Sequence, residues 1–201
     1  MKEKELYLKK PFQFMKNGTL STLDHESHIS LGRKVSGLLA QLGGEHTFHP
    51  PPETFAFAME TNHAVLANAP EGDLAGFIKM SPWVVNENGL TKMAENSADY
   101  ETLHAEVWKP VCVEIGSLVV APVYQGNNLG KTLVREMTDV AEHSYPQLPK
   151  IAVVTDDNVP SLHVFGSLGW EIIGRKEAHK LIGIDVLEGW TPPSTIFLFK
   201  S

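Results

Sequence analysis

An apolar run at Val111–Ala121 leads through a loop rich in glycine and asparagine into an amphipathic helix pattern, and this unit constrains the fold most. Valine, isoleucine and leucine dominate the run, as in a strand buried on both faces. After the loop, apolar residues recur at helical spacing until Pro146: Leu129, Leu133, Val134, Met137, Val140 and Ala141. A buried strand that leads directly into a helix predicts a mixed α/β fold with one parallel crossover.

Weaker patterns predict further elements on both sides of this unit. In chain order they are a strand near 5–15, a helix over 31–42, a short helix after the prolines at 50–52, a hairpin over 62–84, strands over 150–154, 170–174 and 195–200, and a helix over 159–169. The last two strands are expected to be joined by a loop. Residues 85–110 are polar and mixed, and they predict a long variable connection with at most a short helix near 98–107.

Composition limits the domain count and the classes of partner. A length of 201 residues predicts one domain over 1–201. The net charge of −7 argues against nucleic acid or an anionic membrane as the main partner. The chain has no apolar run near the ~18 residues of a membrane span, and its charged start lacks the apolar core of a signal peptide. We therefore expect a cytoplasmic protein. Its single cysteine, Cys112, excludes an intrachain disulfide and is expected to be a small buried hydrophobe.

The loop at Gln125–Lys131 invites comparison with the phosphate-binding loop of nucleotide hydrolases. That loop requires a glycine, four residues, and then glycine, lysine and serine or threonine. Here Gly126 stands only four positions before Gly130, and Gln125 occupies the required place. A residue with a Cβ replaces glycine only at a cost where φ is positive. Nucleotide hydrolysis is therefore the weakest of the functions considered.

A second pattern fits the same loop without a gap. This pattern begins with glutamine or arginine, followed by any two residues, then glycine or alanine, then any one residue, and ends with glycine or alanine. It matches Gln125–Gly130, with Asn128 where glycine is usual. Asparagine is among the residues that best tolerate a left-handed backbone. A second motif consists of Asn158, Ser161, Phe165, Leu168, Gly169 and Trp170. In both motifs the chain resembles the GNAT superfamily of N-acetyltransferases, over about residues 64–175.

The resemblance implies a mixed, twisted central sheet flanked by helices, with two central strands splayed apart to receive coenzyme A. The bulge that causes such a splay is expected near Gly116 and Ser117. The loop at a helix N-terminus offers unpaired amides and a positive dipole end to the pyrophosphate. The cofactor-binding residues that the resemblance implies are Leu118, Val119, Val120, Gln125, Gly126, Asn127, Asn128, Leu129, Gly130, Lys131, Asn158, Ser161 and Phe165. Lys131 is either a charge partner of the phosphates or a solvated first-turn lysine.

Acyl transfer to an amine requires a general base, because the amine must lose a proton before it attacks. Glu114 is the only acidic or basic side chain between Val111 and Val123, and it matches the glutamate that many GNAT enzymes use as base. Burial among valines is expected to raise the pKa of this carboxyl. The alternative is a structural glutamate that reaches water or a lysine. Phe165 stands where many family members have a tyrosine that protonates the leaving thiolate, so the general acid is unassigned.

The predicted function is acetyl-CoA-dependent N-acetylation of a primary amine on a small molecule or peptide. Acetyl-CoA would be the co-substrate. No metal is expected, because among the nine histidines the pairs His25/His28 and His46/His49 lack a third ligand at a spacing typical of metal sites. A non-catalytic acyl-CoA-binding module is the main alternative because of Phe165. Expected partners are acetyl-CoA and an amine acceptor, without nucleic acid or membrane, and a homodimer is left open. Residues 85–110 are expected to select the acceptor.

Overall fold

The computed structural model describes residues 12–16, 19–20, 22–42, 50–86, 91–93, 109–182 and 195–200. Its helices are α2 (His25–Leu42), α3 (Pro52–Glu60), the 3-10 turn η1 (Pro122–Tyr124), α5 (Leu129–Ser144), α6 (Val159–Ser167) and α7 (Arg175–Ile182). Its strands are β1 (Gln13–Met15), β2 (Ala64–Asn68), β3 (Leu74–Val85), β4 (Thr91–Met93), β5 (Lys109–Val120), β6 (Lys150–Thr155), β7 (Glu171–Ile173) and β8 (Thr195–Lys200). Within these residues, no helix is both long enough and apolar enough to cross a membrane.

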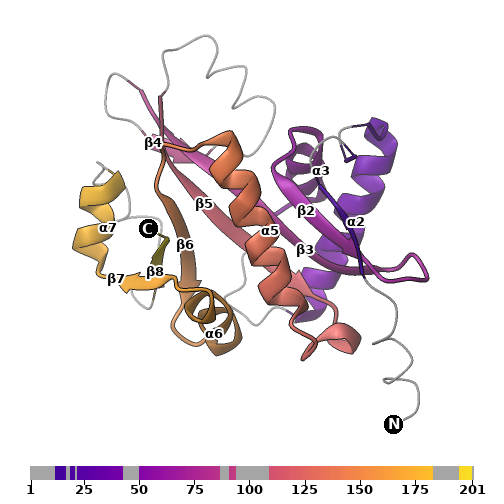
Figure 1. The fold of residues 1–201 in the computed structure, drawn as a ribbon. Helices are drawn as coiled ribbons and strands as arrows, with labels where there is room; N and C mark the ends of the chain where they lie inside the picture. Colours follow the sequence, from indigo (N-terminus) through magenta and orange to yellow (C-terminus); the bar gives the residue numbers. More distant parts are fainter. Residues whose placement is uncertain are drawn as a thin grey trace.

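The strands form one mixed sheet in the order β1-β2-β3-β5-β6-β8-β7, and β4 pairs with β3 outside this path (Figure 1). The pairing of β5 with β6 is parallel, whereas the other pairings among the described strands are antiparallel. Because α5 connects β5 to β6, the predicted strand–loop–helix unit and its parallel crossover are confirmed. The predicted hairpin is also confirmed as β2 and β3.

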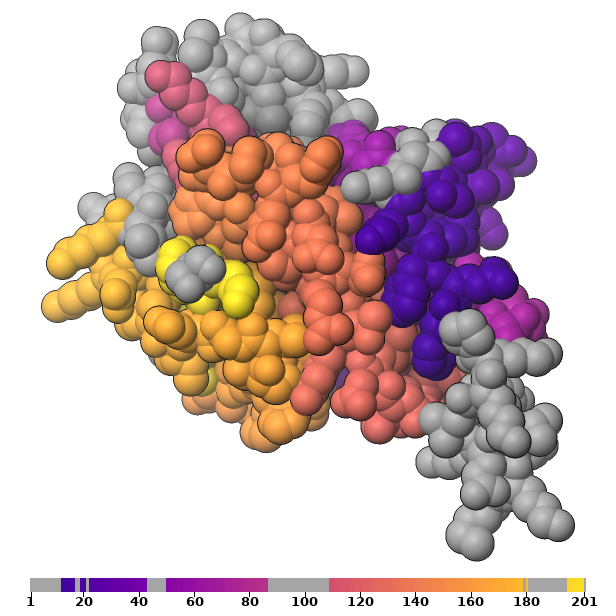
Figure 2. All heavy atoms as spheres, viewed as in Figure 1, coloured from indigo at the N-terminus to yellow at the C-terminus, as the bar shows by residue number. Residues whose placement is uncertain are grey.

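Helices cover both faces of the sheet. On one face lies α5, whose predicted apolar stripe is buried throughout, from Leu129 and Leu133 to Val140 and Ala141. On the other face α2 and α3 pack over the N-terminal half around Phe55 and Phe77. Figure 1 shows α5 crossing in front of β5, with α2 and α3 beside the opposite end of the sheet from α7. In Figure 2 the N-terminal and C-terminal elements flank α5 on one surface.

A bulge in β5 bends the strand near its end. Between the pairs Lys79–Gly116 and Phe77–Val119, β5 has one residue more than β3. Ser117 takes up this extra residue with a φ of 53°, an uncommon conformation for a residue with a side chain. The sequence expectation of a bulge near Gly116 and Ser117 is confirmed.

The two central strands separate just before this bulge. Strands β5 and β6 pair only at Val113–Lys150 and Glu114–Ile151, although both continue well beyond these residues. The C-terminal half of β5 therefore has β3 on one side and a gap on the other. This is the splayed strand pair that the resemblance implies.

Three elements differ from the sequence expectations. Helix α2 begins at His25 rather than Leu31, because Asp24 accepts a hydrogen bond from the amide of Ser27 at 2.8 Å and caps the helix. Part of the supposed connection over 85–110 is strand β4, and the supposed closing loop contains α7. The start of the first predicted strand and the short helix near 98–107 lie outside the described residues.

Candidate active site

A cleft of about 690 Å³ opens where β5, α5 and α6 meet. The end of β5 forms its floor, and the first turns of α5 and α6 form two of its walls. Its lining residues are Leu39, Leu42, Leu118, Val119, Val120, Tyr124, Gln125, Gly126, Asn128, Leu129, Gly130, Lys131, Asn158, Pro160, Ser161, His163 and Val164. Eleven of the thirteen residues predicted to bind the cofactor are among them. The other two, Asn127 and Phe165, do not line the cleft.

The loop before α5 lines the cleft and leads into the helix through two left-handed residues. Gly126 has a φ of 80° and Asn128 has a φ of 59°, so both adopt the left-handed conformation, and the asparagine fits where glycine is usual. The backbone amide of Thr132 donates a hydrogen bond to the carbonyl of Asn128 at 3.1 Å. The amides of Leu129 and Gly130 precede this first bond of the helix and have no partner inside α5. Such a helix start attracts anions such as phosphate.

The floor of the cleft offers backbone polar groups on the open side of β5. Ala121 donates its amide to Ala75 of β3 at 2.9 Å. Because peptide groups alternate in direction along a strand, those of Leu118 and Val120 point away from β3, toward the gap. The carbonyl of Val120 accepts a bond from the Gln125 side chain at 3.0 Å, which ties the loop to the strand.

Helix α6 presents one face to the cleft and turns another into the core. Asn158 caps the helix by accepting from the amide of Ser161 at 3.2 Å, and both residues line the wall. Phe165 is 2% exposed and packs edge-to-face on Trp170, with ring centroids 4.9 Å apart. The second motif therefore supplies wall residues at its start and core residues at its end.

Glu114 lies at the point where the gap between β5 and β6 begins, four residues before Leu118 on the same strand. Its Oε2 accepts a hydrogen bond from the indole Nε1 of Trp83 at 2.9 Å. A Cβ placed on Gly116 would lie 3.4 Å from Oε1, so this second oxygen extends along β5 toward the bulge. A half-buried carboxylate at the apex of the splay is suited to accept a proton from a nucleophile held there.

Two other titratable groups near the site are unsuited to proton transfer to the cofactor. Burial raises the pKa of the Cys112 thiol, and the negative charge of Glu114 raises it further, so this cysteine stays a neutral core residue. Tyr124 lines the cleft, but its hydroxyl donates to Glu71 at 2.7 Å. Its ring also packs edge-to-face against Phe12, with ring centroids 5.6 Å apart.

Sequence reasoning missed several residues of the cleft and of its surroundings. Leu39 and Leu42 reach it from the end of α2, and His163 reaches it from α6. The helical pattern of α2 was visible, but its arrangement over the end of β5 depends on tertiary packing. The bond of Trp83 to Glu114 was also missed, because it depends on the register between β3 and β5.

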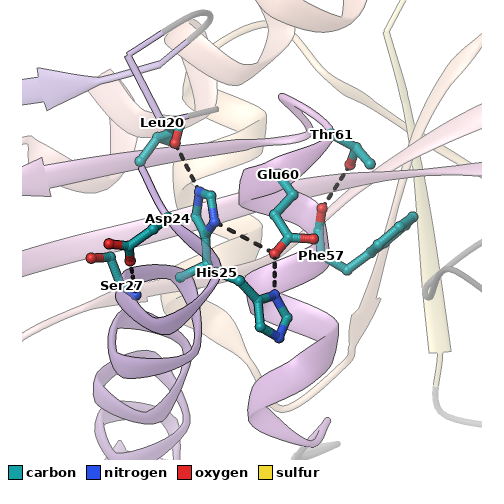
Figure 3. A network of polar contacts seen from close by, with 8 residues as sticks. Leu20, Asp24, His25, Ser27, Phe57, Glu60 and Thr61 are labelled. Atoms are coloured by element: carbon teal, nitrogen blue, oxygen red, sulfur yellow. Dashed lines mark hydrogen bonds and ion pairs between the residues drawn. The ribbon is translucent and has the colours of Figure 1, made fainter. Parts of the chain in front are cut away.

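Two histidines of α2, His25 and His28, contact Glu60 of α3, and Figure 3 shows His25 beside this carboxylate. Oε1 of Glu60 lies 2.7 Å from Nδ1 of His25 and 3.5 Å from Nδ1 of His28, and the other ring nitrogen of His28 bonds to Leu20 O at 2.8 Å. Within the described ranges, no group of three or more histidine, cysteine, aspartate or glutamate side chains could hold a metal ion. The network joins α2 to α3. The pair His46/His49 lies outside the described residues.

Solved structures with the same fold include several acetyltransferases. A GNAT-family acetyltransferase from Staphylococcus aureus Mu50 has a TM-score of 0.55 and 10% identity, with 94% of this chain and 98% of that chain covered. The Salmonella typhimurium protein yncA, solved with its cofactor acetyl-CoA, has a TM-score of 0.55 and 12% identity, with coverage of 94% and 92%.

A third structure is diaminobutyrate acetyltransferase EctA from Paenibacillus lautus, in complex with its substrate L-2,4-diaminobutyric acid and coenzyme A. It has a TM-score of 0.56 and 12% identity, with coverage of 94% and 93%. At these identities the likeness establishes the fold alone. No curated protein sequence matches the chain significantly.

The model of the acetyltransferase (GNAT) family matches residues 36–170, which is more than half of the chain and includes both motifs, the bulge and the cleft. The chain therefore belongs to the GNAT family of acetyltransferases.

Proposed function

We propose that this protein transfers the acetyl group of acetyl-CoA to a primary amine, and that residues 1–201 act as one catalytic domain. One observation carries the proposal: the cleft contains the helix start at Gly126–Gly130 and the open edge of β5. Glu114 does not line this cleft, but it lies on the same strand, at the point where β5 and β6 stop pairing. The gap matches the cofactor's chemistry in order, with an anion site first, then amide partners, then a base. Solved neighbours with acetyl-CoA or coenzyme A bound support acetyl-CoA as the co-substrate.

In this proposal the pyrophosphate binds the amides of Gly126–Lys131, and the pantetheine arm runs along Leu118 and Val120. Glu114 accepts a proton from the amine, directly or through one water. The amine nitrogen then forms a bond to the carbonyl carbon, and the bond between that carbon and sulfur breaks. The acetylated amine and coenzyme A are the products, and the thiolate takes its proton from solvent or from a group still to be identified.

A non-catalytic acyl-CoA-binding module is the second candidate function, and Phe165 favours it. This side chain has no proton to give, it is buried against Trp170, and the hydroxyl of Tyr124 is engaged by Glu71. The cofactor site would then serve affinity without turnover. The two candidates differ in one measurable respect, namely whether coenzyme A is released when an amine is added.

A thiol-release assay with acetyl-CoA and a panel of amines distinguishes the two functions. The panel should contain polyamines, amino acids, drug-like amines and peptide N-termini, with mass spectrometry of each acceptor to detect the acetylated product. We expect thiol release that depends on both enzyme and amine, and that yields an amide. Measurable acetyl-CoA binding without release from any amine would favour the binding module, and no binding at all would refute both.

Acceptor selection is proposed to reside in residues 85–110, of which the structure describes only 85–86, 91–93 and 109–110. Variants shortened within this segment should react with a changed set of amines while they retain their acetyl-CoA affinity. An equal loss of cofactor affinity in a folded variant would contradict this division of roles.

A further inference from the structure

The bond between Trp83 and Glu114 joins a fixed core side chain to the carboxylate at the apex of the gap. Trp83 lies on β3, which is paired at this residue with β5 through Cys112 and with β4 through Met93. Glu114 is directly opposite Ser81, so its side chain reaches diagonally along the sheet to the indole. The indole is 4% exposed, and a strand with partners on both sides gives it little freedom to move.

The surroundings of the indole are apolar and packed. Its core cluster contains Trp83, Cys112, Ile151, Ile173, Ala178 and Phe197, from five strands and α7. An indole N–H can only donate a hydrogen bond, and a buried one that loses its acceptor incurs a desolvation cost. The indole and the carboxylate therefore hold each other in one arrangement.

This arrangement assigns different surroundings to the two carboxylate oxygens. Oε2 accepts from the indole at 2.9 Å, while Oε1 lies over Gly116, where an added Cβ would be only 3.4 Å away. Gly116 immediately precedes the bulge at Ser117, and β5 has lost contact with β6 at this level. Oε1 is the oxygen nearer to this level of β5, and in the proposal it is the one that a nucleophile at the apex would meet.

We propose that Trp83 is a positioning residue for the base Glu114: it holds Oε2 and thereby aims Oε1 at the amine beside the thioester. This inference rests on the proposed function. Trp83 touches neither acetyl-CoA nor the amine in this account, and it acts through the carboxylate. Gly116 leaves the space beside Oε1 open, since an added methyl group there would touch this oxygen at 3.4 Å.

In this proposal Trp83 also favours the ionised form of the base, because the indole N–H donates to the carboxylate. Burial of the carboxyl acts in the opposite direction. Among the described residues, Lys79 lies on the same face of β3 as Ser81, and the Cys112 thiol lies two residues from Glu114 on β5. Arg175 of α7 contacts the same core cluster through Phe197, with its guanidinium carbon 5.7 Å from the ring centroid. None of these three side chains is a carboxylate that would compete for the proton.

The decisive experiment compares pH profiles of kcat/KM for the wild type, Trp83→Phe and a matched core variant, Phe197→Leu, with one amine throughout. Phe197 belongs to the same buried cluster, and its side chain has no hydrogen-bond donor for Glu114. Loss of the indole donor should raise the midpoint of the rising limb by about one pH unit in Trp83→Phe. The midpoint of Phe197→Leu should stay where it is in the wild type. A folded Trp83→Phe variant with an unmoved midpoint would overturn the proposal.

A measurement on the wild type makes the test independent of how well Trp83→Phe folds. The indole ¹H–¹⁵N resonance of Trp83 should titrate with the same midpoint as the rising limb, and Glu114→Gln should abolish that titration. An indole signal that is insensitive to pH would also overturn the proposal. If no amine releases coenzyme A, the proposed function fails on its own, and the resonance still decides whether the indole holds the carboxylate.

Discussion

A substitution at Gly130 should leave the protein folded and weaken its binding of the cofactor. A Cβ added there would lie 3.6 Å from Val164 Cγ2, 3.8 Å from Val120 Cγ2 and 3.9 Å from Leu118 Cδ2. These are ordinary van der Waals distances, so Gly130→Ala creates no clash within the protein. All three neighbours line the cleft, which means that the methyl group projects into the proposed cofactor path.

The expected effects on stability and on binding have opposite signs. Alanine is favoured over glycine in a helix by up to about 1 kcal/mol, so the stability of Gly130→Ala should stay the same or rise slightly. The methyl group keeps the pyrophosphate away from the amides, and the affinity for coenzyme A should fall about tenfold, or roughly 1.4 kcal/mol. Gly130→Asp adds a negative charge, and two like charges 4 Å apart repel by up to about 4 kcal/mol at an effective dielectric constant near 20. A loss of at least a hundredfold is therefore expected.

Isothermal titration calorimetry with coenzyme A measures the affinity, and urea unfolding measures the stability. The matched control is Gly37→Ala in α2, where an added Cβ would meet no atom within 4 Å. It should gain helix stability and leave the cofactor affinity unchanged. A folded Gly130→Asp variant that binds coenzyme A like the wild type would refute the placement of the pyrophosphate at the start of α5.

Three further predictions concern the scaffold. Gly32→Ala should cost roughly 1–3 kcal/mol in urea unfolding, because the new Cβ would lie 2.3 Å from the backbone oxygen of Pro52; full stability would refute the close helix contact. Burial, helped by the charge of Lys79, lowers the pKa of His63 from 6.5 to about 4. Only the unfolded chain gains a proton between these values, so stability should fall by up to about 3 kcal/mol as the pH drops from 6.5 to 4. His63→Gln should flatten that slope, and an equal slope would contradict the assignment. Glu60→Gln should lower stability by about 1 kcal/mol by weakening its histidine contacts, measured by thermal unfolding; an unchanged midpoint would show that they contribute nothing.

The strand–loop–helix unit was predictable because its local signals agree with one another. The valine-rich strand, the left-handed positions at Gly126 and Asn128, and the apolar stripe of α5 each indicate the same structure, and the structure has all three. The bulge was predictable for a different reason, because only the resemblance to a known family indicated it. Its cause, the positive φ of Ser117, leaves little trace in the sequence.

The elements that were missed lack such agreement. Strand β4 has three residues and is defined by its pairing with β3 rather than by its own composition. Helix α7 is short and strongly charged, and it borders a proline-containing segment. The start of α2 was placed too late because the apolar periodicity begins after its first turn. The capping aspartate, Asp24, was the signal that could have located it.

Contacts within the site depend on register and packing, which one sequence does not reveal. The sequence correctly placed Glu114 on a strand and the loop at Gln125–Gly130 before a helix. The indole of Trp83, however, reaches the carboxylate only because Ser81 pairs with Glu114. The arrangement of α6 likewise turns Phe165 into the core and leaves Val164 facing the cleft. Both outcomes follow from how the sheet and the helices pack together.

The central claim is that Glu114 is the base at the apex of the gap, and Glu114→Gln tests it most directly. Glutamine keeps the shape and can still accept a bond from the indole, but it cannot take a proton from the amine. Single-turnover transfer from bound acetyl-CoA to the best acceptor should slow by ~10² to 10⁴, with acetyl-CoA affinity nearly unchanged and the rising limb of the pH profile lost. A folded Glu114→Gln enzyme with wild-type transfer and an unaltered pH profile would contradict the account.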